Sequence, residues 1–132
     1  MARLILDTSL LVSAERDGIE AIERLVGDED DVAVATITAA ELLVGVELAD
    51  EGRRAARKEF VETVLEAISV EDYDLDVAVA HAALLAHTRR GDQPRGAHDL
   101  IIAATGRARN REVVSADLAG FADLPGVVLR RD

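Results

Sequence analysis

Cysteine is absent from this chain of 132 residues, and aromatic residues are nearly absent. The lack of cysteine excludes disulfides and thiolate metal sites and favours a reducing compartment. Tyr73, Phe60 and Phe121 are the only aromatic residues, so a surface that stacks a row of bases is not expected. The longest apolar runs reach about five residues, far short of the ~20 that a membrane-spanning helix needs. Asp7 also comes too early for a secretory signal, and we therefore expect a cytoplasmic protein without a membrane segment.

Positive charge is scarce as well, because the chain has a formal net charge of −11 and Lys58 is its only lysine. A simple nucleic-acid binder is expected to be basic, so the surface as a whole does not favour binding of nucleic acid. Any contact with RNA must depend on local groups of arginines and on a cation bound at an acidic site. Arginine supplies every other basic side chain and is the better bidentate partner for phosphate.

Short apolar runs alternate with segments of helical periodicity. Strands are predicted at 3–6, 32–37, 67–70, 112–115 and 127–130, and helices at 18–26, 38–49, 52–66, 76–90 and 98–109. This alternation favours an α/β fold with a five-stranded parallel sheet flanked by helices on both faces, and the length fits a single domain over 1–132. Ligands of such sheets bind beyond the carboxyl ends of the strands.

Four acidic residues stand at that edge of the predicted sheet. Asp7 follows the first strand, Glu41 lies in the first turn of the helix after the second strand, Asp99 begins the helix at 98–109, and Asp117 comes two residues after the fourth strand. Divalent cations such as Mg²⁺ and Mn²⁺ prefer carboxylate oxygens. Two carboxylates 4 Å apart repel by roughly 4 kcal/mol at an effective dielectric constant of about 20, so we expect the four groups to converge within the coordination shell of a bound cation.

Each acid also has a purely structural interpretation. Thr38 and Glu41 fit a capping box, Asp99 fits an N-cap or an acid that stabilises the helix dipole, and Asp117 fits a turn. Asp7 resists such an explanation because it lies between two apolar runs, where a buried carboxylate needs a partner. Asp7 is therefore predicted on its own, and the other three as members of a set.

Four segments resemble the acidic motifs of PIN-domain ribonucleases, and more closely those of the toxins of VapBC toxin–antitoxin modules: LILDTSLLV (4–12), TITAAELLVGVELA (36–49), GAHDLIIAATGRARN (96–110) and VVSADLAGFADLPGV (113–127). The resemblance implies a PIN-like nuclease domain. Its catalytic and metal-binding acids would be Asp7, Glu41, Asp99 and Asp117, and the supporting hydroxyls would be Thr8 or Ser9, and Ser115. It further implies dependence on Mg²⁺ or Mn²⁺, endonucleolytic cleavage of RNA, a homodimer and an inhibitory cognate antitoxin. Ala116 and Leu118 depart from the polar or basic residues that many relatives carry beside the fourth acid.

The remaining polar groups are interpreted from their positions. Arg95, with Arg89 and Arg90, is a candidate for phosphate contact because this stretch leads into Asp99. A solvated helix face is predicted for Arg53, Arg54, Arg57 and Lys58. The three histidines are interpreted as structural, with His98 in a loop, and the run from Asp72 as a turn that ends in an N-cap at Asp76.

Other function classes fit the residues less well. A phosphatase with Asp7 as nucleophile usually has a second acid two residues later, where this chain has Ser9, and a receiver domain needs a late lysine, whereas the only lysine is Lys58. The alternative that remains is a PIN-like domain that acts as a non-toxin RNA-processing nuclease or as a catalytically weak binding module.

Overall fold

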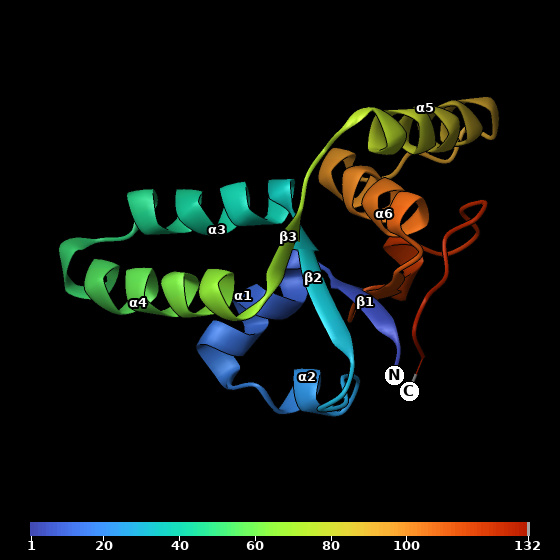
Figure 1. Ribbon diagram of the computed structural model, residues 1–132. Helices are drawn as coiled ribbons and strands as arrows, with labels where there is room; N and C mark the ends of the chain where they lie inside the picture. Colours follow the sequence, from blue (N-terminus) through green and yellow to red (C-terminus); the bar gives the residue numbers. More distant parts are fainter. Residues whose placement is uncertain (132) are drawn as a thin grey trace.

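Four parallel strands form the centre of the molecule, and helices cover both faces of their sheet (Figure 1). The computed structural model describes residues 1–131. The strands are β1 (Arg3–Leu6), β2 (Asp31–Ala35), β3 (Ser69–Glu71) and β4 (Glu112–Val114), in the order β3-β2-β1-β4. The helices are α1 (Thr8–Asp17), α2 (Glu20–Glu23), α3 (Thr36–Leu48), α4 (Glu51–Ala67), α5 (Leu75–Arg90) and α6 (Ala97–Arg109), and a short 3-10 helix η1 spans Leu118–Gly120.

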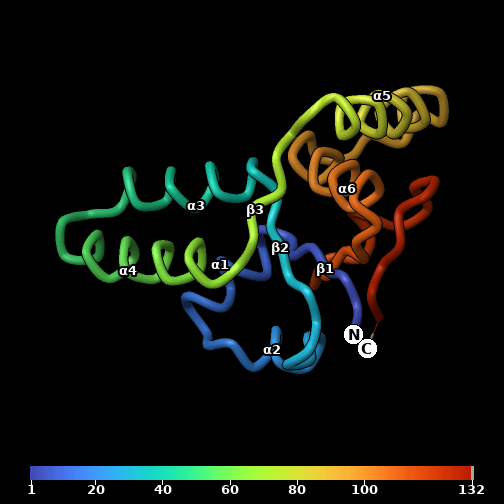
Figure 2. Tube along the Cα trace, in the orientation of Figure 1, coloured from blue at the N-terminus to red at the C-terminus, as the bar shows by residue number. Residues whose placement is uncertain are grey.

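Successive strand residues enter two different apolar cores, as the pleat of a β-strand requires. Ile5 and Val113 belong to the core that α5 and α6 cover, whereas Leu4, Leu6 and Val114 belong to the core under α1, α3 and α4. The Cα trace shows α5 and α6 on one side of the strands and the α3–α4 hairpin on the other (Figure 2). Burial on both faces explains why β1, β2 and β4 are apolar after their first, charged residue and do not alternate in polarity.

The middle of α6, over residues 100–106, is buried on nearly all sides, as its apolar sequence predicts. Ile102, Ala103 and Ala104 are enclosed between the sheet and α5. No helix within residues 1–131 combines the length and the apolar character that crossing a bilayer requires.

The predicted fifth strand at 127–130 is wrong. Only Leu129 pairs, through an isolated parallel bridge to Val113, so the sheet has four strands. Val113 donates its N–H to the carbonyl of Val128 and accepts from the N–H of Arg130, which holds the segment beside β4. These two bonds at Val113 are the only backbone hydrogen bonds between the segment and β4 within the described residues, so no ladder forms.

The predicted helix at 18–26 is wrong in its bounds. The chain forms α1 directly after Asp7, with Leu10, Leu11 and Ala14 on its buried face, and only the single turn of α2 falls within the predicted range. Gly18 ends α1 with a φ of 96°, a backbone conformation that glycine adopts at little cost. Most of the apolar residues at 19–26 pack against the core, but most of this segment is irregular and does not form a regular helix.

The N-cap of α5 is Asp74 and not Asp76 as predicted. The Asp74 side chain accepts a hydrogen bond from the N–H of Val77, and Arg109 Nη2 lies 2.6 Å from its carboxylate. The hydrogen bond from Val77, and after it the bond from Arg109, hold the pKa of Asp74 below its usual value. Asp76 lies in the first turn, where it still favours the helix dipole.

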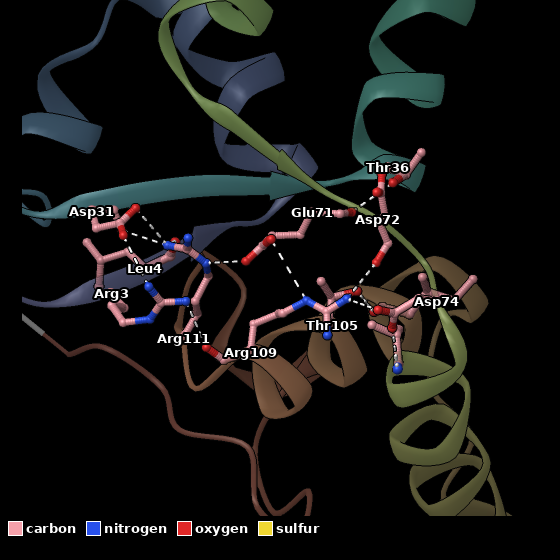
Figure 3. A network of polar contacts seen from close by, with 12 residues as sticks. Arg3, Leu4, Asp31, Thr36, Glu71, Asp72, Asp74, Thr105, Arg109 and Arg111 are labelled. Atoms are coloured by element: carbon pink, nitrogen blue, oxygen red, sulfur yellow. Dashed lines mark hydrogen bonds and ion pairs between the residues drawn. The ribbon is translucent and has the colours of Figure 1, made fainter.

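Arg111 lies in the turn between α6 and β4, and its side chain, only 5% exposed, joins three strands (Figure 3). Its Nη1 donates to the carbonyls of Leu4 and Asp31, at 3.2 and 2.9 Å, and to Asp31 Oδ1 at 3.1 Å. Its Nε donates to Glu71 Oε2 at 2.8 Å. A single guanidinium therefore links β1, β2 and β3 to the end of α6.

Two helix glycines are expected to respond in opposite directions to the same substitution. A Cβ at Gly106 would lie 3.1 Å from the carbonyl oxygen of Arg111 and 3.2 Å from Ile5 Cγ2, whereas a Cβ at Gly45 would only touch Arg57 Cδ at 3.7 Å. Gly106→Ala should therefore lower the free energy of unfolding by about 1–2 kcal/mol. Gly45→Ala should raise it by roughly 0.5–1 kcal/mol, because alanine is the better helix former. Urea denaturation of both variants measures the difference, and an equal gain from both would show that α6 does not pack as closely as described.

Candidate metal centre

Asp7 connects β1 to α1 and is 4% exposed. Its Oδ2 accepts hydrogen bonds from Ser9 Oγ at 2.5 Å and from Ser115 Oγ at 2.7 Å. Within residues 1–131 no hydrogen bond reaches Oδ1, and no fully buried side-chain oxygen lacks a partner. Oδ1 must therefore reach solvent, which it does through the cavity that Asp7 lines. The two serines hold one carboxylate oxygen and leave the other available to a ligand.

Glu41 is positioned by two side chains from other elements. Thr8 Oγ1 donates to Glu41 Oε1 at 3.0 Å and lies 2.9 Å from the hydroxyl of the fully buried Thr38. His98 Nδ1 lies 3.2 Å from the other carboxylate oxygen, Oε2. Because α3 begins at Thr36 and its N-cap is Ala35, the capping-box interpretation of Thr38 and Glu41 is wrong.

Asp99 and Asp117 meet on either side of Gly120. Asp99 is the third residue of α6, so the N-cap interpretation is wrong, since Gly96 has that position. Asp117 is the N-cap of η1, accepts from the N–H of Gly120 at 3.3 Å and donates its own N–H to Ser115 Oγ, so its predicted turn role is confirmed. A Cβ at Gly120 would lie 3.2 Å from Oδ2 of both Asp99 and Asp117. The missing side chain at 120 thus leaves room for both carboxylates.

All four predicted acids border one open cavity of about 460 Å³, together with Thr8 and Ser9. The pKa of Asp99 is raised above its usual value, first by burial of the carboxyl group and then by the negative charges of Asp7, Asp117 and Glu41. His98 acts in the opposite direction. Burial and the negative charge of the other three carboxylates therefore disfavour ionisation of Asp99.

The donor set fits a hard divalent cation. His98 is the only basic side chain in ion-pair range of any of the four carboxylates within residues 1–131. A buried carboxylate such as Asp7 needs compensation, and oxygen-only donors suit Mg²⁺ or Mn²⁺.

The carboxylates do not yet form a finished coordination shell. Within residues 1–131 no group of three acidic or imidazole side chains is close enough to hold an ion as it stands. The expectation that all four converge within one shell is therefore wrong for this conformation. Mutual repulsion and separate hydrogen bonds on Asp7, Glu41 and Asp117 keep the groups apart.

Sequence reasoning missed the roles of Thr38 and His98. His98 was placed in a loop, but it lies in the first turn of α6 beside Glu41, with its side chain 52% exposed. Its position next to Asp99 in the sequence was the available signal. Thr38 was considered only as a cap, and no local pattern indicates that a threonine on α3 meets Thr8 after β1.

The arginines divide into two groups. On α4, predicted as a solvated face, Arg57 Nε pairs with Glu15 Oε1 at 2.9 Å, and Arg54 donates to the carbonyls of Glu47 and Ala49. Arg95 Nη1 donates to the carbonyl of Gly120 at 3.2 Å, which brings this predicted phosphate contact next to the acidic cavity.

Comparison with known proteins gives one consistent result. The sequence profile of the family described as PIN domain matches residues 4–127. The chain is 30% identical to the tRNA(fMet)-specific endonuclease VapC of Salmonella typhimurium, over 96% of each protein, and 27% identical to the ribonuclease VapC of Rickettsia bellii, over 92% of this chain and 90% of that protein. Among solved structures, a VapBC-5 toxin–antitoxin complex from Mycobacterium tuberculosis contains a similar chain with a TM-score of 0.81 and 30% identity, over 99% of this chain and 100% of that one.

Proposed function

This chain belongs to the PIN-domain family and is a VapC-type ribonuclease, and from that premise we propose that its four cavity-lining carboxylates hold the divalent cation with which it hydrolyses RNA. The observation that carries the proposal is the cavity itself. Four carboxylates line it, and no arginine or lysine in the described chain neutralises them. A cation is the simplest source of the missing charge.

Asp7, Asp99 and Asp117 would hold the cation, and Glu41 would complete the site or orient the attacking water. A bound divalent cation supplies positive charge at the phosphoryl oxygens and makes water more acidic. The protein's own part is orientation. Ser9 and Ser115 fix Asp7, while Thr8 and His98 hold the two oxygens of Glu41.

The biological setting follows from the relatives. We assign the chain as the toxin of a type II toxin–antitoxin pair that acts in the cytoplasm, with Mg²⁺ as its cation and Mn²⁺ as a working substitute. Its partners would be a cognate antitoxin protein and a second copy of this chain. Because a relative at 30% identity is named a tRNA(fMet)-specific endonuclease, tRNA is the first substrate to test.

Metal addition should stabilise the purified protein and permit cleavage. At a concentration of 100 times the dissociation constant, a ligand that binds only the folded state adds about 2.7 kcal/mol, so Tm should rise by roughly 10 °C in Mg²⁺ or Mn²⁺ at pH 7. The raised pKa of Asp99 means that the ionised form needed by the cation is lost early as the pH falls. The metal-induced rise in Tm should therefore shrink at pH values still above the usual aspartate pKa of about 4.

Thermal denaturation in EDTA and in metal, at several pH values, measures this effect beside cleavage of labelled tRNA. The exposed Asp28 provides a matched control, and Asp28→Asn should retain both the Tm shift and cleavage. Full cleavage in EDTA, or a metal response that survives loss of Asp99, would contradict the proposal.

A further inference from the structure

We propose that a second cavity, between the end of α5 and the segment leading into α6, binds a phosphate of the RNA strand beside the bond that is cut, through Arg89 and Arg95. This inference rests on the proposed ribonuclease function. It adds the place where the polyanionic strand is held in a chain that is otherwise strongly acidic.

The second cavity has a volume of about 300 Å³. Its polar lining is Thr88, Arg89, Asp92 and Arg95, and its apolar lining is Leu85, Pro94 and Leu100. Leu100 directly follows Asp99, and the Arg95 guanidinium donates to the carbonyl of Gly120. Since Gly120 also lies against the carboxylates of Asp99 and Asp117, a single residue separates Arg95 from the acidic cavity.

The second cavity differs in charge from the acidic cavity, because arginines contribute to its lining. Arg89, Arg90 and Arg95 lie within seven positions of the sequence, and none is in ion-pair range of a carboxylate in the part of the chain that the structure describes. On the other side of the acidic cavity, Arg57 is paired with Glu15 and Arg16 with Asp17. Arg53 on α4 also makes no ion pair within the described residues, so the α5–α6 group is distinguished by its three closely spaced arginines and by the hydrogen bond from Arg95 to Gly120 beside Asp99 and Asp117.

A phosphodiester suits this arrangement better than another anion would. Each guanidinium offers a planar fork that matches two phosphate oxygens, and the apolar wall can contact a ribose or base. Asp92 carries the only carboxylate in the lining, and it would oppose a ligand that is densely acidic. Because Arg95 donates to Gly120, which lies against Asp99 and Asp117, a strand that leaves the acidic cavity at Gly120 would meet the Arg95 guanidinium.

The test uses the full chain with Asp7→Asn as a non-cleaving background and labelled tRNA as the probe. We expect Arg89→Ala and Arg95→Ala each to weaken binding about tenfold at low salt. Each should also reduce the slope of log K against log salt concentration by about 0.7, the value for one phosphate contact on a single strand. Arg24→Ala removes the same charge from an exposed position at the C-cap of α2 and should change neither quantity.

Cleavage kinetics separate binding from indirect effects. With Asp7 intact, Arg89→Ala and Arg95→Ala should raise KM and leave kcat nearly unchanged, and Arg95→Lys should restore part of the affinity. Unchanged salt slopes in both alanine variants would overturn the inference, and so would a loss confined to kcat in Arg95→Ala, which would mean that Arg95 only supports Gly120. If the variants bind RNA as well as the wild-type chain does, the phosphate site is refuted and the ribonuclease proposal stands. If the wild-type chain neither binds nor cuts RNA, the phosphate site and the ribonuclease proposal are both refuted.

Discussion

Asp7→Asn is expected to lower the rate of RNA cleavage by about a thousandfold, which corresponds to roughly 4 kcal/mol of transition-state stabilisation. The carboxylate lies at the end of the central strand β1, and its Oδ1 is the oxygen that reaches the cavity. An amide in its place carries no charge and is a much weaker ligand for a hard cation. The loss should appear in kcat and should not be recovered by raising the RNA concentration.

The same substitution should leave the fold intact. The carbonyl oxygen of an asparagine can still accept the hydrogen bonds from Ser9 and Ser115. One charge is removed from a set of four that repel one another, so the Tm of the metal-free protein should stay level or rise. Cleavage assays and thermal denaturation of Asp7→Asn, with Asp28→Asn beside it, decide the matter. Substantial cleavage by purified Asp7→Asn protein would refute the assigned role.

Arg111→Met should produce the largest loss of stability, about 3 kcal/mol, or a fall in Tm of roughly 10 °C. The substitution keeps most of the volume of the side chain but leaves Glu71 and the carbonyls of Leu4 and Asp31 without their shared donor. Removing one partner from a buried charged network costs more than the network itself contributes, because the remaining groups stay desolvated.

Arg3 offers a matched control for Arg111, because it also pairs with Asp31, at 3.2 Å, but with its side chain 47% exposed. Arg3→Met should cost less than about 1 kcal/mol, as exposed ion pairs usually do. Urea unfolding of both variants gives the comparison. Similar small losses in the two would show that the arrangement in Figure 3 contributes little to stability.

The sequence was sufficient to predict the parallel sheet and the edge at which the acids gather. Apolar strands followed by acidic residues are local patterns, and the rule that places ligands beyond the carboxyl ends of strands turns them into one location. The structure places Asp7, Glu41, Asp99 and Asp117 around one cavity in agreement with that rule. The predicted bounds agree closely with the observed ones where apolar residues recur at a regular helical spacing, as in α4 and α5.

The rest depended on contacts that no local pattern contains. No element is predicted from the sequence over the residues of α1, although Leu10, Leu11 and Ala14 form one helical face. The apolar run at 127–130 has the composition of a strand, but within the described residues only Leu129 pairs with β4, through a single bridge to Val113. Arg111 could not be distinguished from the other arginines, since its partners come from residues 4, 31 and 71.

The parallel pairing of β1 with β4 has a consequence for the order in which the enzyme is made. Leu4 pairs with Glu112, and Ser115 donates to Asp7 across 108 positions of sequence. While the chain is still emerging from the ribosome, β1 has an unfilled edge, and Asp7 lacks both its second hydroxyl donor and its neighbour Asp117. Synthesis proceeds from the N-terminus at about 5–20 residues per second, so the acidic cavity can be completed only after Ser115 and Asp117 have been synthesised. A toxin built in this way cannot assemble its four carboxylates while the chain is shorter than that.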